Sequence, residues 1–131
     1  MKNGLVKLSD FGIAKDTVSE TSQTRTRAVM GTLQYMSPEQ RLNTKNTTVQ
    51  TDIYALVATL YNLMTLDDPM DLFIQDIRHE LVEELPLSVQ NIIHKGCCSD
   101  LDVRYASASE LIADLEELCH EATVNELNLT R

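Results

Sequence analysis

The 131-residue sequence has little glycine, proline or aromatic content: four Gly, three Pro, 5% aromatic side chains and no tryptophan. A hydrophobic fraction of 43% and a charged fraction of 24% exclude a disordered tail and a collagen-like fibre. No apolar run is long enough for a membrane span, and the first ten residues lack the apolar core of a signal peptide. We therefore expect one modest, soluble globular domain in the cytoplasm.

Positive charge and paired cysteines are also scarce. Eleven Lys and Arg against 20 Asp and Glu give a net charge of −9, which excludes a nucleic-acid-binding surface, because phosphate contacts need clustered cations. Cys97, Cys98 and Cys119 are an odd number without C-x-x-C spacing, so neither a disulfide framework nor a zinc site is indicated. We expect the adjacent pair to be buried as small hydrophobic residues.

The first residues predict a strand whose partner is not in the sequence. Asn3-Gly4 is typical of a hairpin turn, and the apolar residues 5–8 that follow indicate a short strand. Only two residues precede the turn, so a lone strand would keep unpaired backbone groups. Residues 16–27 are polar except for Val18 and rich in Ser and Thr, which indicates a loop.

The remainder is predicted to be helical. A helix is expected to begin at Pro38, after Ser37, with Glu39 favourable at its positive end. Four more helices are predicted by apolar residues at helical spacing. The first two have Ile53, Leu56, Val57, Leu60, Leu63 and Met64, and then Phe73, Ile77 and Leu81. The last two have Val89, Ile92 and Ile93, and then Ala108, Leu111, Ile112, Leu115, Leu118 and Cys119. We expect the first of these four to be central and buried, Gly96 to cap the third, and residues 122–131 to fray.

Several short motifs follow one another in a fixed order. Asp10-Phe11-Gly12 comes directly after the predicted strand, and the polar loop ends in Ser37-Pro38-Glu39. The order and spacing are typical of a kinase activation segment. Residues 52–56 (DIYAL) and 102–107 (DVRYAS) continue the series. The sequence thus resembles the eukaryotic-like (Hanks-type) Ser/Thr protein kinases of bacteria, from about Gly4 to about Leu118.

The resemblance implies a mainly α fold. It would be an incomplete C-terminal lobe of the protein-kinase fold, which belongs to the α+β folds, with one short N-terminal strand or hairpin followed by about four helices. Residues 1–121 would form the partial kinase domain, with the activation segment at 10–39 and the helical lobe at 40–121. Residues 122–131 would be a frayed tail. The intact family uses ATP and Mg²⁺.

Cofactor and modification sites are implied by the resemblance for the activation segment. Asp10 would chelate Mg²⁺ at the nucleotide phosphates, since a hard cation prefers carboxylate oxygen. Phe11 would set the orientation of Asp10, and Gly12 would let the backbone turn. Thr24 and Thr26 occupy the position of activating phosphates, which order a loop by pairing with Arg. The alternatives are a carboxylate that caps a turn and a Ser/Thr loop that is never modified.

Substrate and structural residues are implied as well. Thr32 would contact the catalytic Asp of the family and help to seat a substrate hydroxyl; the alternative is a turn residue. Glu39 and Arg104 would form a buried ion pair that joins the activation segment to the last helices. Asp52 would bind the backbone of the catalytic loop. The sequence contains no such loop and therefore no catalytic base.

Other kinase parts are also missing from the sequence. It has no Gly-rich loop, no V-A-I-K lysine and no helix-C glutamate, and Val57 stands where the family commonly has glycine. Three hypotheses follow: a kinase part that is inactive alone, a helical interaction module that binds a partner, or one half of a split kinase whose N-terminal lobe comes from another chain. For the isolated chain we expect no ATP turnover, weak Mg–ATP binding, and marginal stability or self-association.

Overall fold

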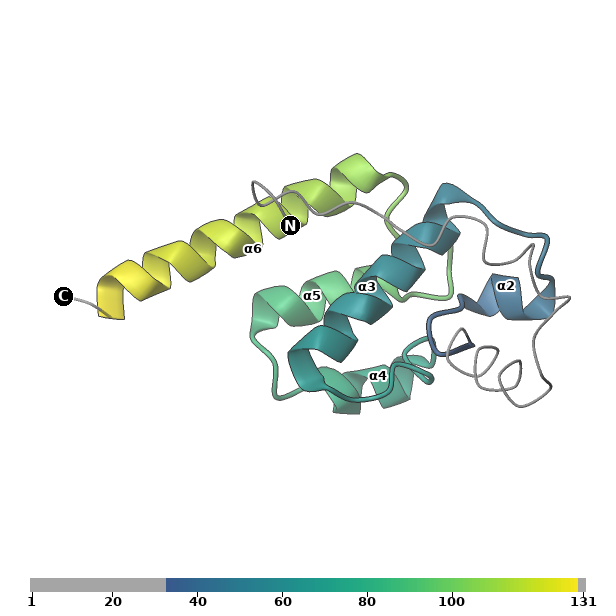
Figure 1. Cartoon of the computed structure of the whole chain (residues 1–131), viewed down its shortest axis with the longest axis horizontal. Coiled ribbons are helices and arrows are strands. Elements are labelled where there is room, and N and C mark those ends of the chain that lie inside the picture. Colours follow the sequence, from purple (N-terminus) through teal and green to yellow (C-terminus); the bar gives the residue numbers. More distant parts are fainter. Residues whose placement is uncertain (1–32, 130–131) are drawn as a thin grey trace, which may run out of the picture. The chain divides into compact units, whose positions relative to one another are not determined.

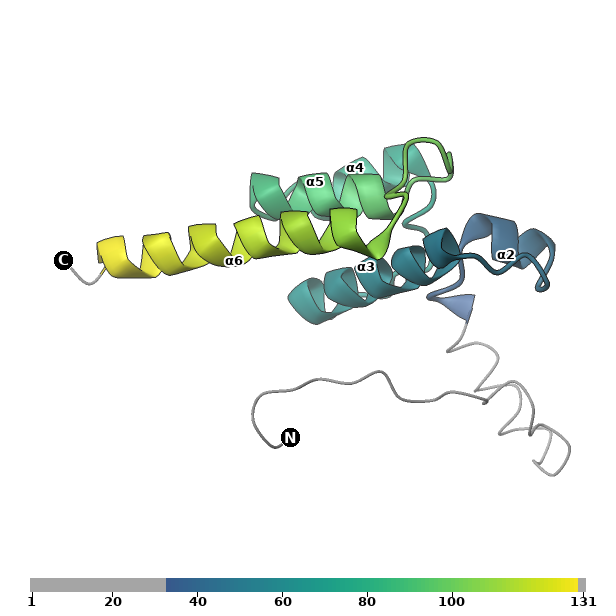
Figure 2. The same ribbon diagram turned by 90° about the horizontal axis from the view of Figure 1, so that it is seen from above.

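The computed structural model describes residues 33–129; the predicted strand and the polar loop lie outside this range. The described residues form helices and connecting loops and contain no strand, which confirms the mainly helical class (Figures 1 and 2). The helices are α2 (Pro38–Leu42), α3 (Val49–Thr65), α4 (Gln75–Val82), α5 (Leu87–Gly96) and α6 (Ala108–Leu129).

The core lies where α5 meets its neighbours. This helix packs against α3, α4 and α6, and α3 also touches α6. Both views show the C-terminal half of α6 extending past the other helices (Figures 1 and 2). Of the cysteine pair expected to be buried, Cys97 is fully buried and Cys98 only partly. The fully enclosed apolar side chains come from α3, α4, α5 and the connecting loops: Ile53, Tyr54, Val57, Ala58, Tyr61, Leu72, Val82, Val89, Ile92, Ile93, Cys97 and Tyr105.

The short helix α2 begins where the sequence predicts. Ser37 is its N-cap, and the Ser37 side chain accepts a hydrogen bond from the Gln40 backbone N–H at 3.3 Å. Pro38 occupies the first turn, where its missing N–H costs nothing, and Glu39 lies at the positive end of the helix. The cap therefore fixes the position of Glu39 in the first turn of α2.

Helix α3 is central, but its buried face differs from the predicted one. The prediction placed Leu56 and Leu63 in the core, yet they are 44% and 70% exposed. Ile53 and Val57 are buried as predicted, and Tyr54 and Tyr61 complete the buried stripe at helical spacing. The aliphatic pattern was wrong at Leu56 and Leu63 because it ignored the tyrosines, whose rings bury more area than a leucine side chain.

Helix α4 agrees with the prediction only in part. Leu81 and Phe73, which precedes the helix, pack against the core as expected, whereas Ile77 is 37% exposed. The buried residues are Arg78 and Val82, four positions apart. An arginine can occupy such a position when nearby carbonyl groups accept its N–H bonds.

Helix α5 agrees with the prediction except at its end. Val89, Ile92 and Ile93 are buried as expected. Gly96, however, is the last residue of the helix and not its cap, which is Cys97. A Cβ atom on Gly96 would lie 2.7 Å from Cβ of Val57. The glycine is therefore required for the close approach of α3 and α5, not for ending the helix.

Helix α6 starts as predicted and continues further than expected. The Ser107 hydroxyl accepts a hydrogen bond from the Glu110 backbone N–H at 3.3 Å, which caps the first turn. Leu111 is buried, whereas Ile112 is 51% exposed. The helix runs on to Leu129, through most of the segment for which we expected fraying. Because residues 119–129 are all exposed, nothing in the packing tests a domain boundary at 121.

Candidate functional site

The structure brings together two of the implied site residues, Glu39 and Arg104. Arg104 Nη1 lies 2.6 Å from Glu39 Oε1, and Arg104 Nη2 lies 3.1 Å from Oε2. The guanidinium thus donates two parallel hydrogen bonds to one carboxylate, the strongest geometry for this pair. The Arg104 side chain is completely buried, and that of Glu39 is 18% exposed. The bond joins the first turn of α2 to the loop before α6.

Two further hydrogen bonds from Arg104 go to backbone carbonyls. Its Nε donates to the Cys98 carbonyl at 2.9 Å, and Nη1 donates to the Gln50 carbonyl at 3.1 Å. On the other side, the Thr51 hydroxyl donates to Glu39 Oε1 at 3.3 Å. The ion pair is therefore the centre of a network that connects α2, the start of α3 and the loop after α5.

The environment of Glu39 favours its charged form. Burial alone would raise the pKa of the carboxyl group. Hydrogen bonds from Arg104, the backbone and Ser37, together with the Arg104 charge, outweigh burial and hold the Glu39 pKa below its ordinary value of 4.5. The pair is therefore ionised at neutral pH.

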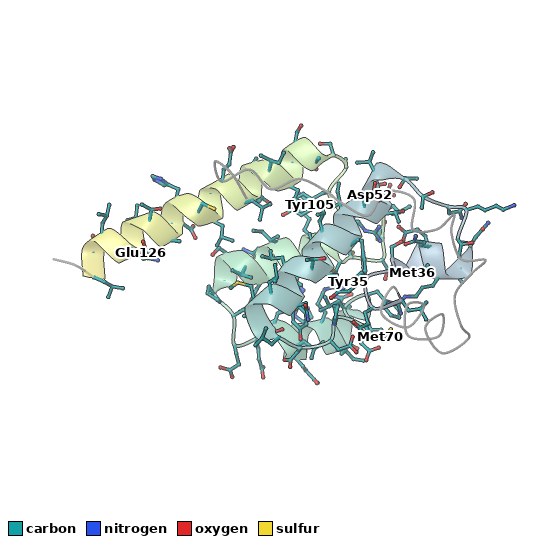
Figure 3. All side chains as sticks on the ribbon, viewed as in Figure 1. Tyr35, Met36, Asp52, Met70, Tyr105 and Glu126 are labelled. Carbon is teal, nitrogen blue, oxygen red and sulfur yellow. The ribbon has the colours of Figure 1, made fainter. Side chains whose placement is uncertain are left out.

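A second arginine, Arg41, fixes the residues just before α2. Its Nη2 donates to the carbonyls of Leu33 at 3.1 Å and Met70 at 2.9 Å, and its Nε donates to the Met36 carbonyl at 3.2 Å. The guanidinium carbon lies 4.6 Å from the centre of the Phe73 ring. Met36 and Met70, labelled in Figure 3, are thus connected through one side chain.

Sequence reasoning missed Arg41. The only available signal was its position in the helix that Ser37 and Pro38 predict, two residues after Glu39. The Tyr35 hydroxyl adds a contact to Asn62 Oδ1 at 3.4 Å, between the same segment and α3. Residues 33–41 are therefore attached to the helical lobe through several side chains.

Asp52 lies in the first turn of α3, near the N-terminal end of that helix (Figure 3). It is exposed, and no side-chain partner for it lies within residues 33–129. Its proposed contact to a catalytic loop stays a prediction. The other implied residues fall outside the described range: Asp10, Phe11, Gly12, Thr24, Thr26 and Thr32.

Metal-ligating side chains do not gather in the described part of the chain. No group of three or more His, Cys, Asp or Glu residues between 33 and 129 is placed to hold a metal ion. Within the same residues, no helix combines the length and hydrophobicity that crossing a membrane requires. The described functional geometry is thus that of the Glu39–Arg104 pair and the Arg41 contacts.

Comparison with known proteins gives a consistent result. The family model for the protein kinase domain matches residues 1–124. No solved structure matches the chain. The sequence is 36% identical over 125 residues to the probable serine/threonine-protein kinase PknB of Lactococcus lactis, which covers 86% of this chain and 20% of that protein.

Two further relatives have the same description. Serine/threonine-protein kinase PrkC of Bacillus subtilis is 34% identical over 142 aligned residues, covering 97% of this chain and 21% of that protein. Serine/threonine-protein kinase PknB of Mycobacterium leprae is 33% identical over 122 residues, covering 84% of this chain and 20% of that protein. The chain thus spans about a fifth of the length of these relatives.

Proposed function

Because this chain belongs to the protein kinase domain family, as a partial serine/threonine kinase domain, we propose that it supplies the metal-binding and substrate-positioning part of a kinase. Such an enzyme transfers phosphate from ATP to a serine or threonine hydroxyl of a protein. Phosphoryl transfer depends on positioning and on charge stabilisation more than on covalent chemistry. The chain's own contribution would therefore be to hold groups in place.

The observation that carries the proposal is the double attachment of the segment around α2. Arg104 binds Glu39, and Arg41 binds the backbone of Leu33 and Met36. Both side chains fix the stretch that directly follows Thr32. A residue that seats a substrate hydroxyl needs such a rigid support, because a small misplacement of reacting groups is costly to rate.

The roles of the preceding residues are part of the proposal. Asp10 would hold Mg²⁺, with Phe11 and Gly12 setting its position, and the metal would neutralise charge on the ATP phosphates. Phosphates on Thr24 or Thr26 would order the activation segment by pairing with an arginine.

The proposed partners follow from the same reaction. One is a protein substrate, and another is a kinase N-terminal lobe with the Gly-rich loop and the ATP-anchoring lysine. Leu56 and Leu63 leave part of α3 exposed, which supports a further contact, either to such a lobe or to a second copy. The cytoplasm, where ATP is abundant, is the proposed location.

A chimera tests the proposed function. Residues 1–131 would replace the matched stretch of the Lactococcus lactis relative, and phosphate transfer from ATP to a generic protein substrate would be measured. We expect the chimera to phosphorylate serine or threonine. Asp10→Asn in the chimera should reduce the rate at least about 100-fold, since a catalytic metal ion supplies several kcal/mol of charge stabilisation.

The matched control is Asp16→Asn, which removes the same charge from the polar loop and should leave the rate within about twofold. The 131-residue chain alone should show no turnover, and calorimetry should show at best weak Mg–ATP binding. A folded chimera whose rate is equal with Asp10 and with Asn at that position would refute the assigned metal role. A folded chimera with no activity at all would refute the proposed function.

A further inference from the structure

Arg78 on α4 is an almost completely buried cation without an anionic partner. Its side chain is 4% exposed, and no carboxylate within residues 33–129 forms an ion pair with it. Its Nη1 donates to the carbonyls of Leu72 at 2.8 Å and Cys97 at 3.2 Å. Its Nε donates to His94 Nδ1 at 3.1 Å. A buried charge usually has a counter-ion, so this one raises the question of what compensates it.

The third nitrogen of Arg78 is open. Nη2 donates to no described residue, and it is not one of the enclosed side-chain atoms without a partner. Arg78 lines a cavity of about 690 Å³ between α4, α5 and the loop that follows α5. Two N–H groups of a residue that lines the cavity are thus without an acceptor among the described residues.

His94 adds a second donor to the same cavity. Its Nδ1 accepts the bond from Arg78, so the proton of the neutral ring resides on Nε2. The His79 ring lies 4.4 Å from the His94 ring, centre to centre. Burial, and then the neighbouring charges of His79 and Arg78, lower the pKa of His94, which keeps the ring neutral. The Nε2–H has no acceptor among the described residues.

The charge of the lining favours an anion. Lys95 contributes an ammonium group, which lies 4.6 Å from the centre of the Tyr105 ring, and Gln75 and Asn91 contribute amide donors. Asp100 is the one carboxylate in the lining. The lining residues thus include two with a full positive charge and one with a negative charge, on a chain whose net charge is −9.

We propose that the cavity between α4 and α5 binds a phosphoryl group, either as free phosphate or on a phosphorylated protein side chain. A phosphoryl group has about two negative charges and three acceptor oxygens, which suits a guanidinium, an ammonium and an imidazole N–H from two helices. A carboxylate has half the charge and two oxygens. The proposal rests on described residues alone and stands apart from the proposed function.

Nuclear magnetic resonance titrations of the full chain test this site. The ligands are inorganic phosphate, a phosphoserine peptide, and the same peptide with glutamate in place of phosphoserine, all at constant ionic strength. We expect phosphate and the phosphopeptide to produce saturable shifts of the amides around Gln75, His94 and Lys95. The glutamate peptide should bind at least about tenfold more weakly, because it has fewer charge-assisted hydrogen bonds.

The variants distinguish binding at this cavity from non-specific attraction of the anion to surface lysines. Lys95→Gln should weaken phosphate binding about fivefold to tenfold, and its exposed side chain makes misfolding improbable as an explanation. Lys45→Gln, which removes an equal exposed charge from the loop before α3, should change binding by less than about twofold. Arg78→Lys keeps the charge but loses the fork and should weaken binding further than Lys95→Gln.

The source of the phosphoryl group is decided by comparing ligands. Phosphopeptide binding at least tenfold tighter than phosphate, at the same residues, would assign the site to phosphorylated proteins; equal affinities would assign it to free phosphate. The absence of saturable shifts with both ligands would overturn the proposal. So would equal losses in Lys95→Gln and Lys45→Gln, or equal binding of the glutamate peptide.

Discussion

Gly96→Ala is expected to lower the midpoint of thermal unfolding by about 10 °C, although alanine is the better helix former. The new Cβ atom would lie 2.7 Å from Cβ and 2.8 Å from Cγ1 of Val57, and nearer still to Cγ2. Val57 is buried and β-branched, so its side chain strongly prefers one rotamer in a helix and moves aside only at a cost. Overpacking of this kind costs about 3 kcal/mol, of which the higher helix propensity returns about 1 kcal/mol. Thermal melts followed by circular dichroism measure the difference.

A double variant identifies the cause. Val57→Ala alone leaves a cavity and is destabilising, but in Val57→Ala with Gly96→Ala the new methyl group occupies that space. We expect the two changes to be less harmful together than their sum by about 2 kcal/mol. Asn91→Ala, at an exposed position of the same helix, should change stability by less than about 0.5 kcal/mol. A Gly96→Ala protein as stable as the wild type would contradict the close-packing explanation.

The same contact shows what apolar spacing can predict. The spacing of Val89, Ile92 and Ile93 identifies the buried face of α5 correctly. It cannot predict the role of Gly96, because that role depends on Val57, 39 positions earlier, in a helix whose orientation the pattern does not fix. Glycine after a run of apolar residues usually indicates a helix end. Here the neighbouring helix, not the local backbone, requires it.

Helix α4 shows a different limit of the pattern. Its aliphatic residues place Leu81 correctly against the core but also suggest that Ile77 is buried, whereas the buried residues are Arg78 and Val82. A hydrophobicity pattern treats arginine as a surface residue. The carbonyls of Leu72 and Cys97 accept hydrogen bonds from Arg78 and so compensate its burial. Cys97 is 19 positions further along the chain, and only the fold brings its carbonyl near Arg78. The sequence pattern therefore predicts neither the burial of Arg78 nor the cavity beside it.

The Glu39–Arg104 pair was predictable by resemblance alone. The two residues are 65 positions apart, and no periodic pattern connects them. The order of short motifs implied their contact, and the structure adds the carbonyl acceptors and Thr51 around it. Because an ion pair lies at the centre of this network, substitutions that remove either charge test how much the pair contributes to the free energy of unfolding.

Arg104→Met is expected to lower the free energy of unfolding by about 3–5 kcal/mol, the largest loss among the substitutions considered. The substitution leaves the mostly buried Glu39 carboxylate without its cation, and it also removes the Arg104 donors to the Cys98 and Gln50 carbonyls. Lysine at the same position would keep the charge but lose the two parallel bonds, so Arg104→Lys should have a smaller cost. Urea unfolding followed by circular dichroism measures these differences.

The comparison with Glu39→Gln distinguishes an ion pair from simple packing. The Glu39 pKa is lower in the folded than in the unfolded chain, so its stabilising effect is complete above the unfolded value. It is lost as the pH falls through the folded value. The stability gap between wild type and Glu39→Gln should therefore be constant from about pH 6 to pH 8 and shrink as the pH falls below the ordinary carboxyl value of 4.5.

A double variant tests the same ion pair. Arg104→Met combined with Glu39→Gln should recover part of the loss, since no charge remains unpaired. Lys45→Met, an equal charge removed from an exposed loop, should change little. A gap that stays constant down to acid pH would mean that shape, and not charge, joins α2 to the last helices.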